Sequence, residues 1–198
     1  MSTRTEPGPR QRLLDAAQEL TYQHGMGVGV DALLKGAGVA RRSLYEHFGG
    51  KDGLITEVLR RSAAEDEARY RRTMDAAGHD PRARLLAVFD RIGEIVAGDG
   101  YRGCRYLAAD LALADPEHPG HAVTREYRER VAALFAAELA RLGHPRPAAA
   151  GDQLLLLVDG ALAAGATRPA TDPAAAAREL AEQVIGQAHD RPPLEPRA

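Results

Sequence analysis

A short helix, a tight glycine turn and a second short helix within residues 30–48 constrain this chain more than any other feature. The turn contains Gly38, and glycine adopts the left-handed conformation that such a turn requires. Apolar residues on both sides of the turn are spaced to face one another: Leu33, Leu34, Val39, Leu44 and Phe48. Contacts among them would fix the two helices at a steep angle. The pattern predicts a helix-turn-helix at about residues 29–48.

The outward face of the second helix is polar and begins with two arginines. It consists of Arg41, Arg42, Ser43, Tyr45, Glu46 and His47. Guanidinium groups bind phosphate and also match the guanine edge in the major groove. Lys51 follows at the start of the next helix, where the helix dipole favours an anion. We therefore expect this face to bind double-stranded DNA, the alternative for the arginine pair being a solvated helix end.

The charge distribution agrees with an anionic partner at the N-terminal end. The net charge of the 198 residues is −2, but residues 1–51 hold seven Lys/Arg against five Asp/Glu, and the remainder holds 19 against 23. A uniformly basic surface is thereby excluded, and any anionic partner should meet the first quarter of the chain.

The rest of the chain predicts helices and almost no strands, about nine helices in all, so the fold class is all-α. Asp80-Pro81 and Asp172-Pro173 are typical helix starts. The most apolar run, Leu154 to Ala166, contains Asp159 and is shorter than a membrane span. The polar N-terminus is unlike a signal peptide, and the single cysteine excludes a disulfide scaffold. These features predict a cytoplasmic protein without a membrane partner.

Several of these residues together resemble the TetR/AcrR family of transcriptional regulators. The resemblance covers roughly residues 8–60 and rests on Gly38-Val39, Ser43-Leu44-Tyr45, His47-Phe48, Lys51, Leu54 and the helix from Leu13 to Gly25. It implies an all-helical homodimer that binds an operator through residues 6–66, with Tyr45 and Lys51 on the DNA backbone. Residues 67–189 would form the effector-binding and dimerisation domain, and the proline-rich residues 190–198 a disordered tail.

The segment before the first helix of the predicted motif departs from the family pattern. It looks one residue short, and Gly29 and Val30 stand where the family often has a threonine that binds phosphate and caps the helix. We expect the backbone amides of Gly29 and Val30 to take over that contact.

The C-terminal block carries weaker signals. Candidate effector-pocket residues, each with plain core packing as the alternative, are Phe89, Ile92, Cys104, Leu107, Asp110, Tyr127, Val131 and Asp159. A carboxylate inside an apolar run needs a partner, so Asp159 should meet an arginine of this subunit, an arginine across the dimer, or a cationic effector. Small and apolar residues on the last two helices predict the dimer interface: Leu154, Leu157, Ala161, Leu162, Leu180, Ala181 and Val184.

Other chemistries find less support. His118-Pro119-Gly120-His121 lacks helical ligand spacing, so an interhelical turn is a better interpretation than a metal site. Cys104 is interpreted as a small buried residue rather than a redox sensor. No catalytic motif occurs, which predicts that the chain is not an enzyme and needs no cofactor beyond an effector. The predicted function is a ligand-responsive DNA-binding regulator that acts as a repressor and leaves its operator when a small molecule binds. The alternative is a helical binding module with a degenerate DNA-binding head.

Overall fold

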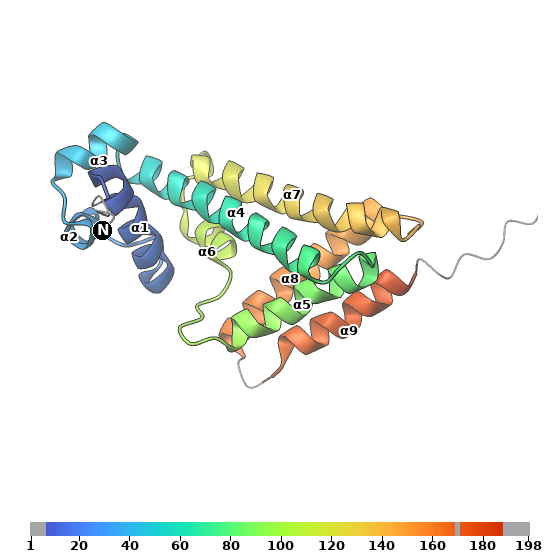
Figure 1. The fold of residues 1–198 in the computed structure, drawn as a ribbon. Coiled ribbons are helices and arrows are strands. Elements are labelled where there is room, and N and C mark those ends of the chain that lie inside the picture. The colour runs from blue at the N-terminus through green and yellow to red at the C-terminus, as the bar shows by residue number, and fades with distance from the viewer. Residues whose placement is uncertain (1–6, 169–170, 188–198) are drawn as a thin grey trace, which may run out of the picture. The chain divides into compact units, whose positions relative to one another are not determined.

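The computed structural model describes residues 7–168 and 171–187, and within them the chain is all-helical (Figure 1). This confirms the predicted fold class, while the proposed tail at 190–198 lies outside the described residues. The nine helices of this part are α1 (Pro9–His24), α2 (Val30–Ala37), α3 (Arg41–Phe48), α4 (Lys51–Ala76), α5 (Pro81–Ala97), α6 (Arg105–Ala112), α7 (Pro119–Arg141), α8 (Pro147–Thr167) and α9 (Pro173–Gly186).

The helices form two compact units that do not follow a single cut along the chain. The first unit contains the residues up to Asp66 together with Arg105–Glu126, and the second contains Glu67–Cys104 and the residues from Tyr127 onward. The sequence predicts one domain over residues 67–189, whereas in the structure α6 and the first turns of α7 group with the N-terminal helices. Helices α4 and α7 each contribute residues to both units.

Polar contacts explain why α6 belongs to the first unit. Arg105 at the start of α6 donates to Ser62 Oγ of α4 at 2.9 Å, and its guanidinium lies 5.0 Å from the ring centroid of Tyr22 on α1. Tyr106 donates to Asp66 Oδ2 at 2.7 Å. The two hydrogen bonds join α6 to α4, and the contact with the Tyr22 ring joins it to α1.

The core of the first unit is built from the apolar positions that define its helices. Leu13 of α1, Leu33 of α2, Leu44 of α3 and Leu54 of α4 are all fully buried and belong to one cluster. Val39 and Phe48 pack against that cluster from the turn and from the end of α3. The facing positions expected around the turn are therefore brought together.

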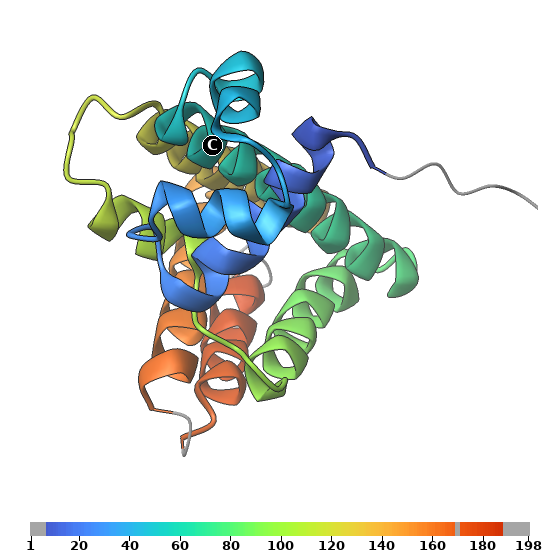
Figure 2. The same ribbon diagram turned by 90° about the vertical axis from the view of Figure 1, so that its left-hand side faces the viewer.

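In the second unit α5, α8 and α9 pack against one another, which can be followed in Figure 2 by their green, orange and red ribbons. Gly165 of α8 permits close approach to α5, because a Cβ atom there would lie 2.4 Å from Val96 Cγ1. By length and composition α8 is the one helix of the described residues that meets the criteria for a membrane span. A single helix of this kind is weak evidence for a span, and α8 packs against α5 and α9 with 33% of its apolar window buried.

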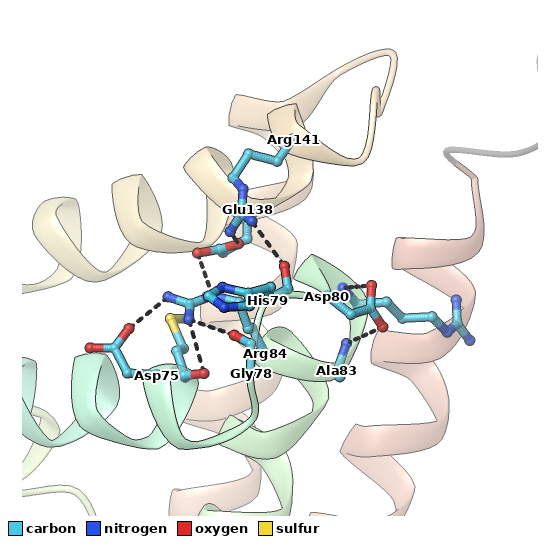
Figure 3. Close-up of polar contacts among 10 residues, drawn as sticks. Asp75, Gly78, His79, Asp80, Ala83, Arg84, Glu138 and Arg141 are labelled. Carbon is cyan, nitrogen blue, oxygen red and sulfur yellow. Dashed lines mark hydrogen bonds and ion pairs between the residues drawn. The ribbon is translucent and has the colours of Figure 1, made fainter.

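An ionic network around the largely buried Arg84–Glu138 pair joins α4, α5 and α7 in this unit (Figure 3). Arg84 of α5 donates to Glu138 Oε1 of α7 at 2.8 Å and to Asp75 Oδ1 of α4 at 3.0 Å. It also donates to the carbonyl oxygens of Met74 and Gly78 at 3.0 and 3.1 Å, so it caps the end of α4.

Candidate nucleic-acid interface

The turn between α2 and α3 has the geometry that its glycine predicts. Gly38 adopts φ 61° and ψ 41°, the left-handed conformation. Its N–H donates to Lys35 O, and the N–H of Val39 donates to Leu34 O, both at 3.2 Å. These bonds satisfy the last carbonyl groups of α2 and set the direction in which α3 leaves the turn.

Helix α3 is buried on one side only. Leu44 of this helix is fully buried, and the half-buried Phe48 packs against the same core cluster. The predicted DNA-binding residues point the other way: Arg41, Arg42, Tyr45 and His47 are exposed, and Ser43 is half-buried. Tyr45 keeps 57% of its surface accessible, which is unusual for an aromatic residue in a small helical unit.

The starts of α2 and α3 leave backbone amides available to an anion. Gly29 and Ala40 occupy the N-cap positions, and within the described residues neither helix receives a side-chain cap. The first amides of a helix have no intrahelical acceptor, so uncapped N-termini favour anion binding. Gly29 is exposed, whereas the side chain of Val30 packs against the core of the unit.

Both arginines of α3 are paired with carboxylates, which the sequence analysis did not anticipate. Arg41 Nη2 lies 2.6 Å from Asp31 Oδ1 at the start of α2, and Arg42 Nε lies 2.5 Å from Glu46 Oε1 one turn along α3. The four-residue spacing of Arg42 and Glu46 could have revealed the second pair. Exposed pairs of this kind contribute little to stability, so phosphate groups can replace the carboxylates at low cost.

The connection from α3 to α4 is set by two glycines. Gly49 and Gly50 have φ values of 72° and 140°, which other residues rarely adopt. Lys51 begins α4 directly after them, where it was expected. Arg10 of α1 supports the same region, because it forms an ion pair with Glu57 at 2.8 Å and lies 5.4 Å from the ring centroid of Phe48.

Comparisons with known proteins agree with this geometry. The family model described as "Bacterial regulatory proteins, tetR family" matches residues 13–58. The crystal structure of a candidate TetR transcriptional regulator from Streptomyces avermitilis is 34% identical, with a TM-score of 0.82 over 92% of this chain and 98% of that one.

The chain belongs to the TetR family. This is a family of transcriptional regulators and not of enzymes.

Two further TetR-like proteins place the chain more broadly. The Escherichia coli (strain K12) HTH-type transcriptional repressor NemR is 30% identical over 117 residues. The matched segment covers 59% of the length of NemR and 58% of the length of this chain. The transcriptional regulator FadR from Bacillus subtilis, described in complex with stearoyl-CoA, shares the fold with a TM-score of 0.69 at 14% identity, over 90% of this chain and 99% of FadR.

The residues predicted for the effector pocket of this TetR-family chain divide between the two units. Phe89, Ile92, Cys104, Tyr127, Val131 and Asp159 belong to the second unit, and Leu107 and Asp110 belong to the first. Phe89, Ile92 and Val131 are fully buried, as plain core packing would also require. Asp159 Oδ2 lies 3.4 Å from Arg128 Nε. Of the three partners expected for Asp159, an arginine of the same subunit is therefore present.

Asp110 forms a small polar cluster with the start of α7. Thr124 donates to Asp110 Oδ1 at 2.7 Å, and His121 Nδ1 lies 3.0 Å from the same oxygen. The hydrogen bond to Asp110 is the main cause that raises the pKa of His121 above its ordinary value, while burial opposes the shift. His121 and His118 have different partners, because the Nδ1 atom of His118 accepts the N–H of Gly120.

The predicted dimer residues fall into two groups. Leu154, Ala161 and Ala181 are buried within the protomer, although Ala161 also lines the groove between α8 and α9. Leu157, Leu162 and Val184 are half-buried, and Leu180 is exposed. An open, mainly apolar groove runs between α8 and α9, lined among others by Leu156, Leu157, Gly160, Ala164, Ala176 and Leu180. Leu156, in the apolar run Leu154–Leu157 of α8, is 72% exposed.

Proposed function

We propose that this chain is a cytoplasmic, homodimeric repressor that binds operator DNA through α3 and releases it when a small molecule binds. The observation that carries the proposal is the arrangement of α3. Leu44 anchors one side of the helix in the core, while Arg41, Arg42 and Tyr45 are exposed on the other. A short helix supported in this way can enter a major groove, with its arginines on phosphates or guanine edges.

The groove between α8 and α9 supports the dimer. Exposed leucines along both helices give a contiguous apolar face, which in a protein of this size indicates an interaction surface. A second copy of the same face would cover it by twofold symmetry. Two α3 helices would then be presented together, as binding to a palindromic operator requires.

The effector site is proposed in the second unit. Family membership supports effector binding, and FadR, which shares the fold, is described with a bound acyl-CoA. Within the second unit, the half-buried Arg128–Asp159 pair would give a polar anchor for a ligand. The effector acts only through a higher affinity for the conformation that does not bind DNA.

The direct test is fluorescence anisotropy of the full-length chain with the DNA that precedes its own gene. Arg42→Ala and Tyr45→Ala should each weaken binding about tenfold, and Arg42→Ala should lower the salt slope by about one. Arg72→Ala is the matched control, since Arg72 is exposed on the part of α4 in the second unit. Specific binding that neither variant changes would contradict the assigned interface. Absence of salt-dependent binding would favour a binding module with a degenerate head.

A further inference from the structure

His118, in the connection between α6 and α7, presents a buried donor without an acceptor. The residue is only 7% exposed, and its Nδ1 accepts the N–H of Gly120 at 3.0 Å. A neutral imidazole whose Nδ1 accepts a hydrogen bond carries its proton on Nε2. That Nε2 atom is buried and has no hydrogen-bond partner among the described residues. A buried N–H without an acceptor lowers the stability of the fold, so an acceptor close to His118 Nε2 is expected.

The atom that faces this donor belongs to the first turn of α4. Asp52 Oδ1 lies 3.7 Å from His118 Nε2, slightly beyond hydrogen-bond distance. The side chain of Asp52 is 79% exposed and can rotate, whereas the imidazole is enclosed. Closing the remaining gap therefore requires movement of the aspartate alone.

The imidazole is held in place by close packing around Gly120. A Cβ atom at residue 120 would lie 2.8 Å from Leu113 Cδ1, 2.9 Å from His118 Nδ1 and 3.1 Å from Leu59 Cδ1 of α4. A larger residue at position 120 would require these side chains to shift. The connection that carries His118 thus packs closely against α4.

Asp52 stands where it would oppose DNA binding. It follows Lys51, the residue proposed to contact a phosphate at the start of α4, so an arriving phosphate meets a carboxylate beside its cationic partner. The negative charges of the Asp52 carboxylate and the phosphate repel each other, and this repulsion is strongest at low ionic strength. A donor that engages the carboxylate from the protein side would reduce that repulsion.

We propose that His118 is a positioning residue for DNA binding: its Nε2–H captures the carboxylate of Asp52 as a phosphate docks at the start of α4, and so leaves Lys51 and the helix amides facing the phosphate. The inference rests on the proposed DNA-binding function. It assigns to the α6–α7 connection a direct part in shaping the interface within the first unit.

Two substitutions at position 118 test the roles of the two ring nitrogen atoms separately. His118→Asn keeps an acceptor for Gly120 N–H but is too short to reach Asp52, whereas His118→Gln places an amide donor near the Nε2 position. Operator affinity of the full-length chain should fall about fivefold in His118→Asn and remain within about twofold of the parent in His118→Gln. Thermal unfolding of each variant checks that the protein remains folded.

A double-mutant cycle with Asp52→Asn decides the proposal. Asp52 is exposed, so this variant should fold even where a substitution at His118 does not. Without the carboxylate charge, His118→Asn should no longer weaken operator binding, and Asp52→Asn alone should bind the operator more tightly than the parent, with the largest gain at low salt. Equal losses in both backgrounds would overturn the proposal, as would an Asp52→Asn variant that binds more weakly at low salt.

Failure of this inference is distinguishable from failure of the proposed function. If the parent chain shows no salt-dependent DNA binding, the function itself is wrong. If Arg42→Ala weakens binding but the effects at positions 52 and 118 are additive, the chain binds DNA and His118 contributes only to packing.

Discussion

Arg84 Nε donates to Glu138 Oε1 at 2.8 Å, and the two side chains retain only 15% and 10% of their exposure. The hydrogen bond to Glu138 is the main cause that raises the pKa of Arg84, so the guanidinium stays charged throughout the range in which the protein is folded. Glu138 also accepts a bond from Arg141. This pair joins the beginning of α5 to the end of α7, while the other nitrogens of Arg84 cap α4 (Figure 3).

Removing Arg84 should therefore destabilise the second unit. We expect Arg84→Ala to lower the free energy of unfolding by about 3 kcal/mol, because Glu138 would keep a mostly buried charge without its main partner. Denaturant unfolding at one fixed protein concentration measures the loss, since the proposed dimerisation would contribute to apparent stability. Arg91→Ala is the control, as its pair with Glu94 is exposed and should matter by less than about 1 kcal/mol. Equal effects of the two substitutions would show that burial of the network is unimportant.

The exposed leucines of α8 and α9 should determine the oligomeric state. Leu156→Glu combined with Leu180→Glu should convert the dimer to a folded monomer, because four charges would meet at the covered face. Sedimentation equilibrium gives the mass, and circular dichroism the helix content. Leu111→Glu is the matched control, since Leu111 is 80% exposed on α6 and lies outside this groove. A dimer that survives the double substitution would place the interface elsewhere.

Glu46 should hold Arg42 back from DNA. Replacing it by glutamine releases the guanidinium and removes a negative charge from the face of α3, so operator affinity should rise about two- to fivefold, more at low salt. Anisotropy titrations at two salt concentrations measure the gain, with Glu129→Gln on the exposed side of α7 as control. Weaker binding to the operator would contradict this account and indicate that Glu46 itself accepts a hydrogen bond from a cytosine.

The His121–Asp110 contact should make stability depend on pH. Because the folded state raises the pKa of His121, its contribution is fully present below the unfolded pKa of about 6.5 and is lost as the pH rises through the higher folded value. The difference in unfolding free energy between the parent and His121→Gln should thus be largest in mild acid and shrink toward alkaline pH. Unfolding midpoints across that range test the sign. A difference that grows with pH would show that His121 is bound as the neutral ring.

Local patterns carried much of the prediction from sequence. Gly38 and the leucines around it favour the turn, because glycine adopts that backbone without steric cost and the apolar residues are spaced to face one another. Asp80 and Asp172 were expected to begin helices, and their carboxylates accept the amides of Arg82, Ala83 and Ala175. Each of these features depends on residues within a few positions of one another.

Features that depend on distant residues could not be obtained in this way. Arg84 and Glu138 are 54 positions apart, and the chain offers many other pairs of opposite charge. Helix α8 is apolar nearly all round, so its sequence does not distinguish the buried Leu154 from the exposed Leu156. The grouping of α6 with the N-terminal helices depends on the contacts of Arg105 and Tyr106 with residues about 40 positions earlier, and no local pattern reveals these contacts.

Helix α3 lies between Gly38 on one side and Gly49 and Gly50 on the other. Leu44 is the single fully buried residue among its eight described positions. The exposed positions can therefore be rewritten as a cassette, provided that the glycine borders and the inward leucine are retained. Such a cassette would allow the regulator to be retargeted to a chosen promoter while its remaining helices stay unchanged.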